Sequence, residues 1–177
     1  MKKTLNSLLA TSCLLGMMVL PAHAETSAKE FKAFSKILSL SKDVPAGSIE
    51  LGVVYDASNA TSKADFDAIK AMIGNGFKGP KHQITLKEVT PADIASSGTP
   101  VLFITEGLDA GAQGKAAETA KANKVLTVST DMGCVESGNC ILGIDVSKGV
   151  KVLMNGNSYR DSGLKFDAAF EFMVKEI

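Results

Sequence analysis

The order of apolar and polar positions along the chain predicts alternating helices and strands. Between residues 26 and 41 the apolar positions, Phe31, Phe34 and Ile37 among them, recur at helical spacing. Short runs rich in Val, Ile and Leu predict strands, and one-sided apolar stripes between them predict further helices. The predicted helices cover residues 26–41, 62–73, a short segment from Thr90, 112–123, 157–163 and 166–177, and the predicted strands cover 49–55, 83–89, 100–105, 124–129, 141–146 and 150–155.

Polar residues at the boundaries complete this pattern. Thr61 or Ser62 is placed to cap the second helix, Thr90 to cap the third, and Asn157 to cap the short helix near the end. Strands that alternate with helices predict parallel pairing, and the turn at residues 147–149 predicts an antiparallel hairpin. The sequence therefore predicts an α/β fold: a single domain with a mixed, mostly parallel sheet and helices on both faces.

Residues 1–24 have the pattern of an export signal. Two lysines near the start precede an apolar run from Leu8 to Leu20, and Ala22-His23-Ala24 supplies the small residues that a signal peptidase needs. The apolar run is shorter than the roughly 20 residues that span a bilayer. We therefore expect cleavage near Ala24, a mature domain of residues 25–177, and a periplasmic location.

Composition limits the partners of the mature chain. Of 19 basic and 19 acidic residues, Lys2 and Lys3 leave with the signal, so 17 basic residues remain and the net charge becomes −2. This balance argues against nucleic acid as a partner. Beyond residue 24, the sequence contains no apolar stretch of membrane-spanning length, so we predict no direct membrane span.

Two cysteines remain after Cys13 departs with the signal. Cys134 and Cys140 lie six positions apart, which in an oxidising compartment predicts a disulfide. A redox dithiol and a metal pair are the alternatives. A redox pair usually has the Cys-x-x-Cys spacing, and a metal would need further ligands where only His82 is left as a histidine.

Candidate chemistry is sparse. The sequence has no Gly-x-Ser-x-Gly elbow and no set of nucleophile, base and orienting residue, so it predicts no catalytic residue, no metal site and no cofactor. Glu106 follows a predicted strand, where open α/β sheets place ligands. Asn155, Asn157 and Arg160 lie around a strand-to-helix turn, and Phe172 is left outward on the predicted last helix. These five residues are the candidate ligand or partner contacts.

Several segments carry a family likeness: residues 37–40, 49–55, 125–129, the loop from Cys134 to Cys140, 141–144, 150–155 and 162–166. Together they resemble the YfiR family of small periplasmic proteins. The resemblance implies an α/β fold without catalysis. The best-known member of that family represses a membrane diguanylate cyclase and responds to envelope redox state through its disulfides. This chain lacks the second cysteine pair, so only the late pair carries over, as a stabilising bridge.

Two functions follow as expectations. The first is a non-enzymatic periplasmic regulator that binds and restrains an inner-membrane sensory protein, with a diguanylate cyclase as the candidate target. The alternative is a periplasmic protein that binds a small molecule at the strand ends near Glu106 and Asn155–Asn157. The sequence leaves open whether the protein forms a homodimer.

Overall fold

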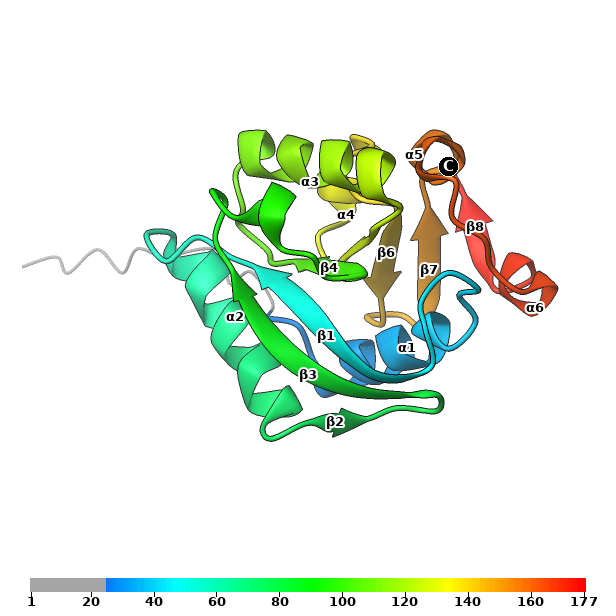
Figure 1. Cartoon of the computed structure of the whole chain (residues 1–177), viewed down its shortest axis with the longest axis horizontal. Helices are drawn as coiled ribbons and strands as arrows, with labels where there is room; N and C mark the ends of the chain where they lie inside the picture. Colours follow the sequence, from blue (N-terminus) through cyan, green and yellow to red (C-terminus); the bar gives the residue numbers. More distant parts are fainter. Residues whose placement is uncertain (1–24) are drawn as a thin grey trace, which may run out of the picture.

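The structure, a computed structural model, describes residues 25–177, so the predicted signal of residues 1–24 lies outside the described residues. The chain builds an eight-stranded sheet in the order β2-β3-β1-β4-β5-β6-β7-β8 (Figure 1). Pairings β2–β3 and β6–β7 are antiparallel, and the other five are parallel. The predicted mixed, mostly parallel α/β sheet is therefore confirmed.

The elements follow one another in a strand-helix order. The strands are β1 (Gly47–Val54), β2 (Phe77–Lys78), β3 (His82–Val89), β4 (Val101–Ile104), β5 (Leu126–Ser129), β6 (Leu142–Asp145), β7 (Lys151–Met154) and β8 (Val174–Glu176). The helices are α1 (Ala28–Leu38), α2 (Ala60–Ile73), η1 (Ile94–Ser96), α3 (Ala110–Asn123), α4 (Met132–Glu136), α5 (Gly156–Ser162) and α6 (Ala168–Glu171).

The centre of the sheet is buried on both faces, and every residue of β4 and β5 is buried. Along β4, Val101 and Phe103 enter a core shared with α1 and α2, whereas Leu102 and Ile104 enter a second core with α3 and α4. Alternation of side chains along a strand sends neighbours to opposite faces. Figure 1 shows α3 and α4 on the side of the sheet opposite α1 and α2, as predicted.

The predicted last helix over residues 166–177 is wrong. The helix α6 lasts four residues, and β8 then pairs in parallel with β7, with Val152 opposite Val174. Phe166 and Phe170 stack with ring centroids 4.1 Å apart and both are buried, but Phe172 is 91% exposed. The helical apolar stripe thus ends at Phe170. The last residues of the chain form a strand because they pair with β7.

Three predicted helix starts also differ from the structure. Asn59, not Thr61 or Ser62, caps α2. The predicted helix after Thr90 is only the turn η1, and the Thr90 hydroxyl donates to the Asp93 carboxylate at 2.6 Å. Asn155 caps α5 in place of Asn157, which lies inside the first turn. For α2 and α5, the capping residue lies earlier in the chain than predicted. After Thr90, the local hydrogen bond closes a turn and no α-helix follows.

The structure contains no helix within residues 25–177 that combines the length and the apolar character needed to cross a membrane.

Candidate functional site

The strand order places a topological switch at the carboxyl ends of β1 and β4. The strand β3 pairs with one side of β1 and β4 with the other, both in parallel. The chain leaves β1 through α2, which packs on one face, and leaves β4 through α3, which packs on the other. Connections that diverge in this way leave a crevice outside the strand ends, where open α/β sheets bind ligands.

A chain of buried hydroxyl groups joins the two strands at this edge. Thr105 donates its hydroxyl to the carbonyl of Val54 at 2.8 Å, so Ser62 must be the donor in the 2.7 Å pair between the Ser62 and Thr105 oxygens. Ser62 in turn accepts the amide of Asp56 at 2.9 Å. Ser62 and Thr105 have no exposed surface. The first turn of α2 is therefore fixed against the ends of both strands.

Gly107 lets the loop after β4 pack closely on the start of α2. Its φ of +75° lies in the left-handed region that favours glycine. A Cβ at this position would lie 2.9 Å from Cβ of Thr61 and 3.0 Å from Oδ1 of Asn59. Because the loop after β4 packs so closely on the start of α2, only a small space remains at the carboxyl ends of β1 and β4.

Asp65 is the central polar residue of the edge. It projects from α2, has no exposed surface, and accepts the amide of Thr26 at 2.7 Å and the amide of Glu106 at 2.9 Å. Burial raises the pKa of the Asp65 carboxyl, and the two amide hydrogen bonds oppose that shift. The carboxyl thereby links α2 to the amino-terminal segment and to the loop after β4.

A cavity of about 210 Å³ opens beside this carboxyl. The predicted contact Glu106 lines it, so the structure places this residue at the switch as expected for a strand end. The lining residues are Glu25, Ala60, Thr61, Ala64, Asp65 and Glu106.

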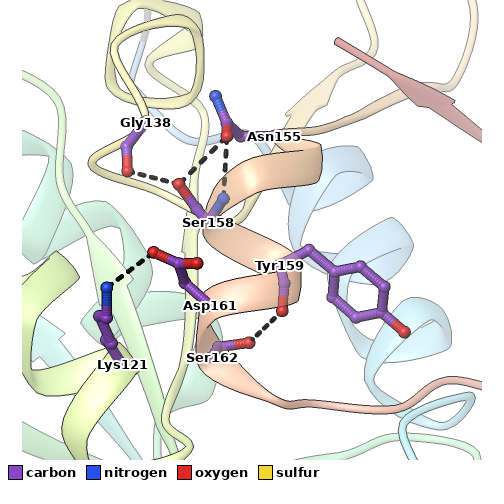
Figure 2. A network of polar contacts seen from close by, with 7 residues as sticks. All are labelled: Lys121, Gly138, Asn155, Ser158, Tyr159, Asp161 and Ser162. Atoms are coloured by element: carbon purple, nitrogen blue, oxygen red, sulfur yellow. Dashed lines mark hydrogen bonds and ion pairs between the residues drawn. The ribbon is translucent and has the colours of Figure 1, made fainter.

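Three of the other predicted contacts, Asn155, Asn157 and Arg160, lie at the opposite edge of the sheet. Asn155 follows β7, which runs antiparallel to β6, so it lies beside the amino end of β6 and donates its amide to the carbonyl of Ile141. Its side chain accepts the amide of Ser158 at 3.0 Å and donates to the carbonyl of Val135 at 3.0 Å. Figure 2 shows Ser158 between Asn155 and the carbonyl of Gly138, to which it donates at 2.7 Å.

This second cluster fastens α5 to its neighbours. Lys121 of α3 pairs with Asp161 of α5 at 2.8 Å (Figure 2). Arg160 pairs with Glu176 of β8 at 2.8 Å and donates to Asn157 at 2.9 Å. Asn155, Asn157 and Arg160 thus have partners within the chain and do not join Glu106 in one site. A cavity of about 180 Å³ lies beside the cluster, between α3, α5 and the disulfide loop.

Phe172 lies apart from both edges, after α6. It is 91% exposed, and Met173 and Ile177 are also exposed, at 51% and 45%. The structure confirms that Phe172 points outward, although from a short turn and not from the long helix that the sequence predicts.

The Cys134–Cys140 bridge is present, with no exposed surface on either cysteine. It joins Cys134 within α4 to Cys140 after the helix, and the loop that it closes supplies the carbonyls of Val135 and Gly138 that Asn155 and Ser158 bind. Within residues 25–177, no three His, Cys, Asp or Glu side chains are grouped so that they could hold a metal ion.

Sequence reasoning missed Asp65 as a site residue, although its pattern contains the signal. Asp65 precedes Phe66 and lies four positions before Ile69, so it falls on the buried stripe of α2 with Ser62 and Ile73. A carboxylate at a position that the helical period reserves for the core is rare unless it has partners. A charged residue at a core position of the helix therefore predicts a buried network of hydrogen bonds around it.

The comparisons with known proteins give a fold likeness. No protein-family model and no curated protein matches the sequence. Among solved structures, the ligand-free, open form of CD0873, a substrate-binding protein with adhesive properties from Clostridium difficile, superposes with a TM-score of 0.58 at 16% identity, covering 84% of this chain and 58% of its own. A conserved domain protein from Vibrio cholerae gives 0.55 at 18% identity, with the same coverage of 84% and 58%.

A third structure, an ABC domain in complex with L-Trp from Streptococcus pneumonia, gives a TM-score of 0.53 at 12% identity, covering 80% of this chain and 60% of its own. At these identities the likeness establishes the α/β fold. The chain spans about three fifths of the length of each of these structures.

Proposed function

We propose that the protein is an exported, non-enzymatic binding protein for a small molecule, with its site at the carboxyl edge of the sheet. The observation that carries the proposal is the cavity at the β1–β4 switch, lined by Glu106 and Asp65. The solved structures support it, since one neighbour is a substrate-binding protein and another was determined with L-Trp. The disulfide supports export, because such bridges persist in oxidising compartments.

The size of the cavity limits the ligand. Its volume of about 210 Å³ lies below the roughly 300–1,000 Å³ that is typical of sites for drug-sized molecules. We therefore expect a compact ligand of metabolite size, or the part of a larger ligand that enters the crevice.

A thermal-shift screen against amino acids, sugars, organic acids and amines tests the proposal. A compound that binds the folded state raises Tm in a concentration-dependent manner. Ala64→Leu fills the cavity from α2 and should abolish this rise, whereas Ala71→Leu, an exposed position on the same helix, should preserve it. A ligand whose effect survives Ala64→Leu, or a screen without any specific hit, would contradict a site at this edge.

A second candidate is the periplasmic regulator that the family resemblance predicts. One observation favours it: Phe172, Met173 and Ile177 expose apolar side chains near the end of the chain. Exposed apolar residues that lie together are typical of protein-binding surfaces. Cross-linking in the envelope should recover an inner-membrane sensory protein, and Phe172→Ser should weaken that recovery. Equal recovery with Phe172→Ser, or recovery of the protein alone, would contradict this candidate.

A further inference from the structure

The carboxyl of Asp65 is fully buried. The described residues, 25–177, contain no ion pair to this side chain, whose partners include the amides of Thr26 and Glu106. A buried carboxylate is costly unless a positive charge or a full set of hydrogen bonds compensates it. The carboxyl group of Glu25, which lines the same cavity, adds negative charge beside Asp65. A cation next to Asp65 would offset the cost of burying this carboxyl.

The amino-terminal segment runs directly over this carboxyl. Thr26 is only 3% exposed, its amide lies 2.7 Å from Oδ1 of Asp65, and its hydroxyl lies 3.1 Å from that of Thr130 after β5. Glu25 lies one residue earlier, and consecutive Cα atoms are about 3.8 Å apart. The backbone nitrogen of Glu25 is therefore one residue from an amide that Asp65 already accepts.

The sequence predicts cleavage between Ala24 and Glu25. Cleavage there changes the Glu25 nitrogen from a neutral amide into an α-ammonium group, whose ordinary pKa of about 7.7–8.0 leaves it largely charged at pH 7. Hydrolysis of the peptide bond adds one water, and the carboxylate product leaves with residues 1–24.

We infer that this newly formed α-ammonium group pairs with the buried carboxyl of Asp65 and fixes the amino-terminal segment across the ends of β4 and β5. Export processing then completes the carboxyl edge of the sheet, and the unprocessed chain lacks this ion pair. The inference rests on the predicted cleavage and goes beyond the proposed function, because it requires no ligand.

The experiment uses the full-length protein exported to the envelope and purified after processing. Mass spectrometry should give a chain that begins at Glu25, and a different first residue would overturn the inference. An insertion of Ser-Gly between Ala24 and Glu25 leaves two residues ahead of Glu25 and restores a neutral amide at its nitrogen. This insertion should lower Tm by at least about 3 °C in the parent protein.

The insertion is then combined with Asp65→Asn and, as a matched control, with Asp67→Asn at an exposed position of α2. The Tm difference should persist with Asp67→Asn and vanish with Asp65→Asn. An equal difference in all three backgrounds would overturn the inference.

A second measurement covers the case in which Asp65→Asn does not fold. The rate at which an amine-reactive reagent labels the α-amino group of the parent protein is followed from pH 6 to 10. Pairing with a carboxylate stabilises the charged form, so the midpoint should lie above the ordinary range of about 7.7–8.0. A midpoint within that range would contradict the ion pair.

Discussion

Breaking the Cys134–Cys140 bridge should lower the free energy of unfolding by a moderate, calculable amount. The two cysteines are six positions apart, so the bridge closes a short ring. Loop-closure entropy for a ring of this size corresponds to about 2.4 kcal/mol at 25 °C. For a chain of this length, about 1 kcal/mol corresponds to roughly 2–4 °C in Tm. We therefore expect Tm to fall by about 5–10 °C.

The fold should survive this loss because other contacts hold the same loop. The amides of Asn139 and Cys140 both donate to the carbonyl of Cys134 at 2.9 Å. Two further carbonyls of the loop accept from the α5 cluster, namely Val135 from Asn155 and Gly138 from Ser158. Reduction should therefore lower the unfolding midpoint without producing a second transition.

The assay compares the oxidised protein with the same protein reduced while unfolded and then refolded in reductant. This route is needed because both cysteines lack exposed surface, so a reductant reaches them only when the chain opens. The comparison keeps every side chain and changes only the cross-link. Equal denaturant midpoints, with two free thiols confirmed by titration, would refute the stabilising bridge. Loss of the folded state would show instead that the loop contacts are too weak to hold it.

The remaining predictions concern three positions. Burial lowers the pKa of His82, so as the pH falls the unfolded chain binds a proton at this residue before the folded chain does. The free energy of unfolding should therefore decrease as the pH drops below about 6.5. In denaturant titrations, His82→Leu should lose less of that free energy between pH 7.5 and 5.5 than the parent protein. An equal loss would contradict a neutral buried imidazole. Gly107→Ala should cost about 1–3 kcal/mol in unfolding free energy from strain, and more from the contact with Thr61. Gly98→Ala, with φ of +64° and open space, is the matched control, and equal costs would refute the close contact. Phe172→Ser should change stability by less than about 0.5 kcal/mol, and a larger loss would show that this side chain packs in solution.

The sequence predicts the centre of the fold better than its ends. Short apolar runs predict the strands β1 and β4, and a one-sided apolar stripe that includes Phe31 and Phe34 predicts the helix α1. The strand β8 has no local pattern of its own, because three residues beside Phe172 become a strand only by pairing with β7. Such pairing depends on a partner that is distant in the chain.

The site divides in the same manner. Glu106 can be predicted as a contact because it follows the apolar run of β4, at the end of a strand where open α/β sheets place ligands. Asn155 lies at the other edge of the sheet because β7 runs antiparallel to β6. That edge can be assigned only when the pairing of the hairpin with the rest of the sheet is known. Asp65 could have been recognised from its place on the buried stripe of α2, but its partner Thr26 is distant in sequence and no pattern connects them.

The two outermost strands have a consequence for self-association. The sheet ends in β2, with two residues, and in β8, with three. Each carries a lysine, Lys78 on one side and Lys175 on the other. The strand β2 covers β3 only at Gln83 and Ile84, and the rest of that margin, up to Val89, carries the charged side chains of Lys87 and Glu88, which disfavour pairing with a foreign strand. Two copies of the protein are therefore expected to associate through side chains, without extending the sheet from one molecule to the next.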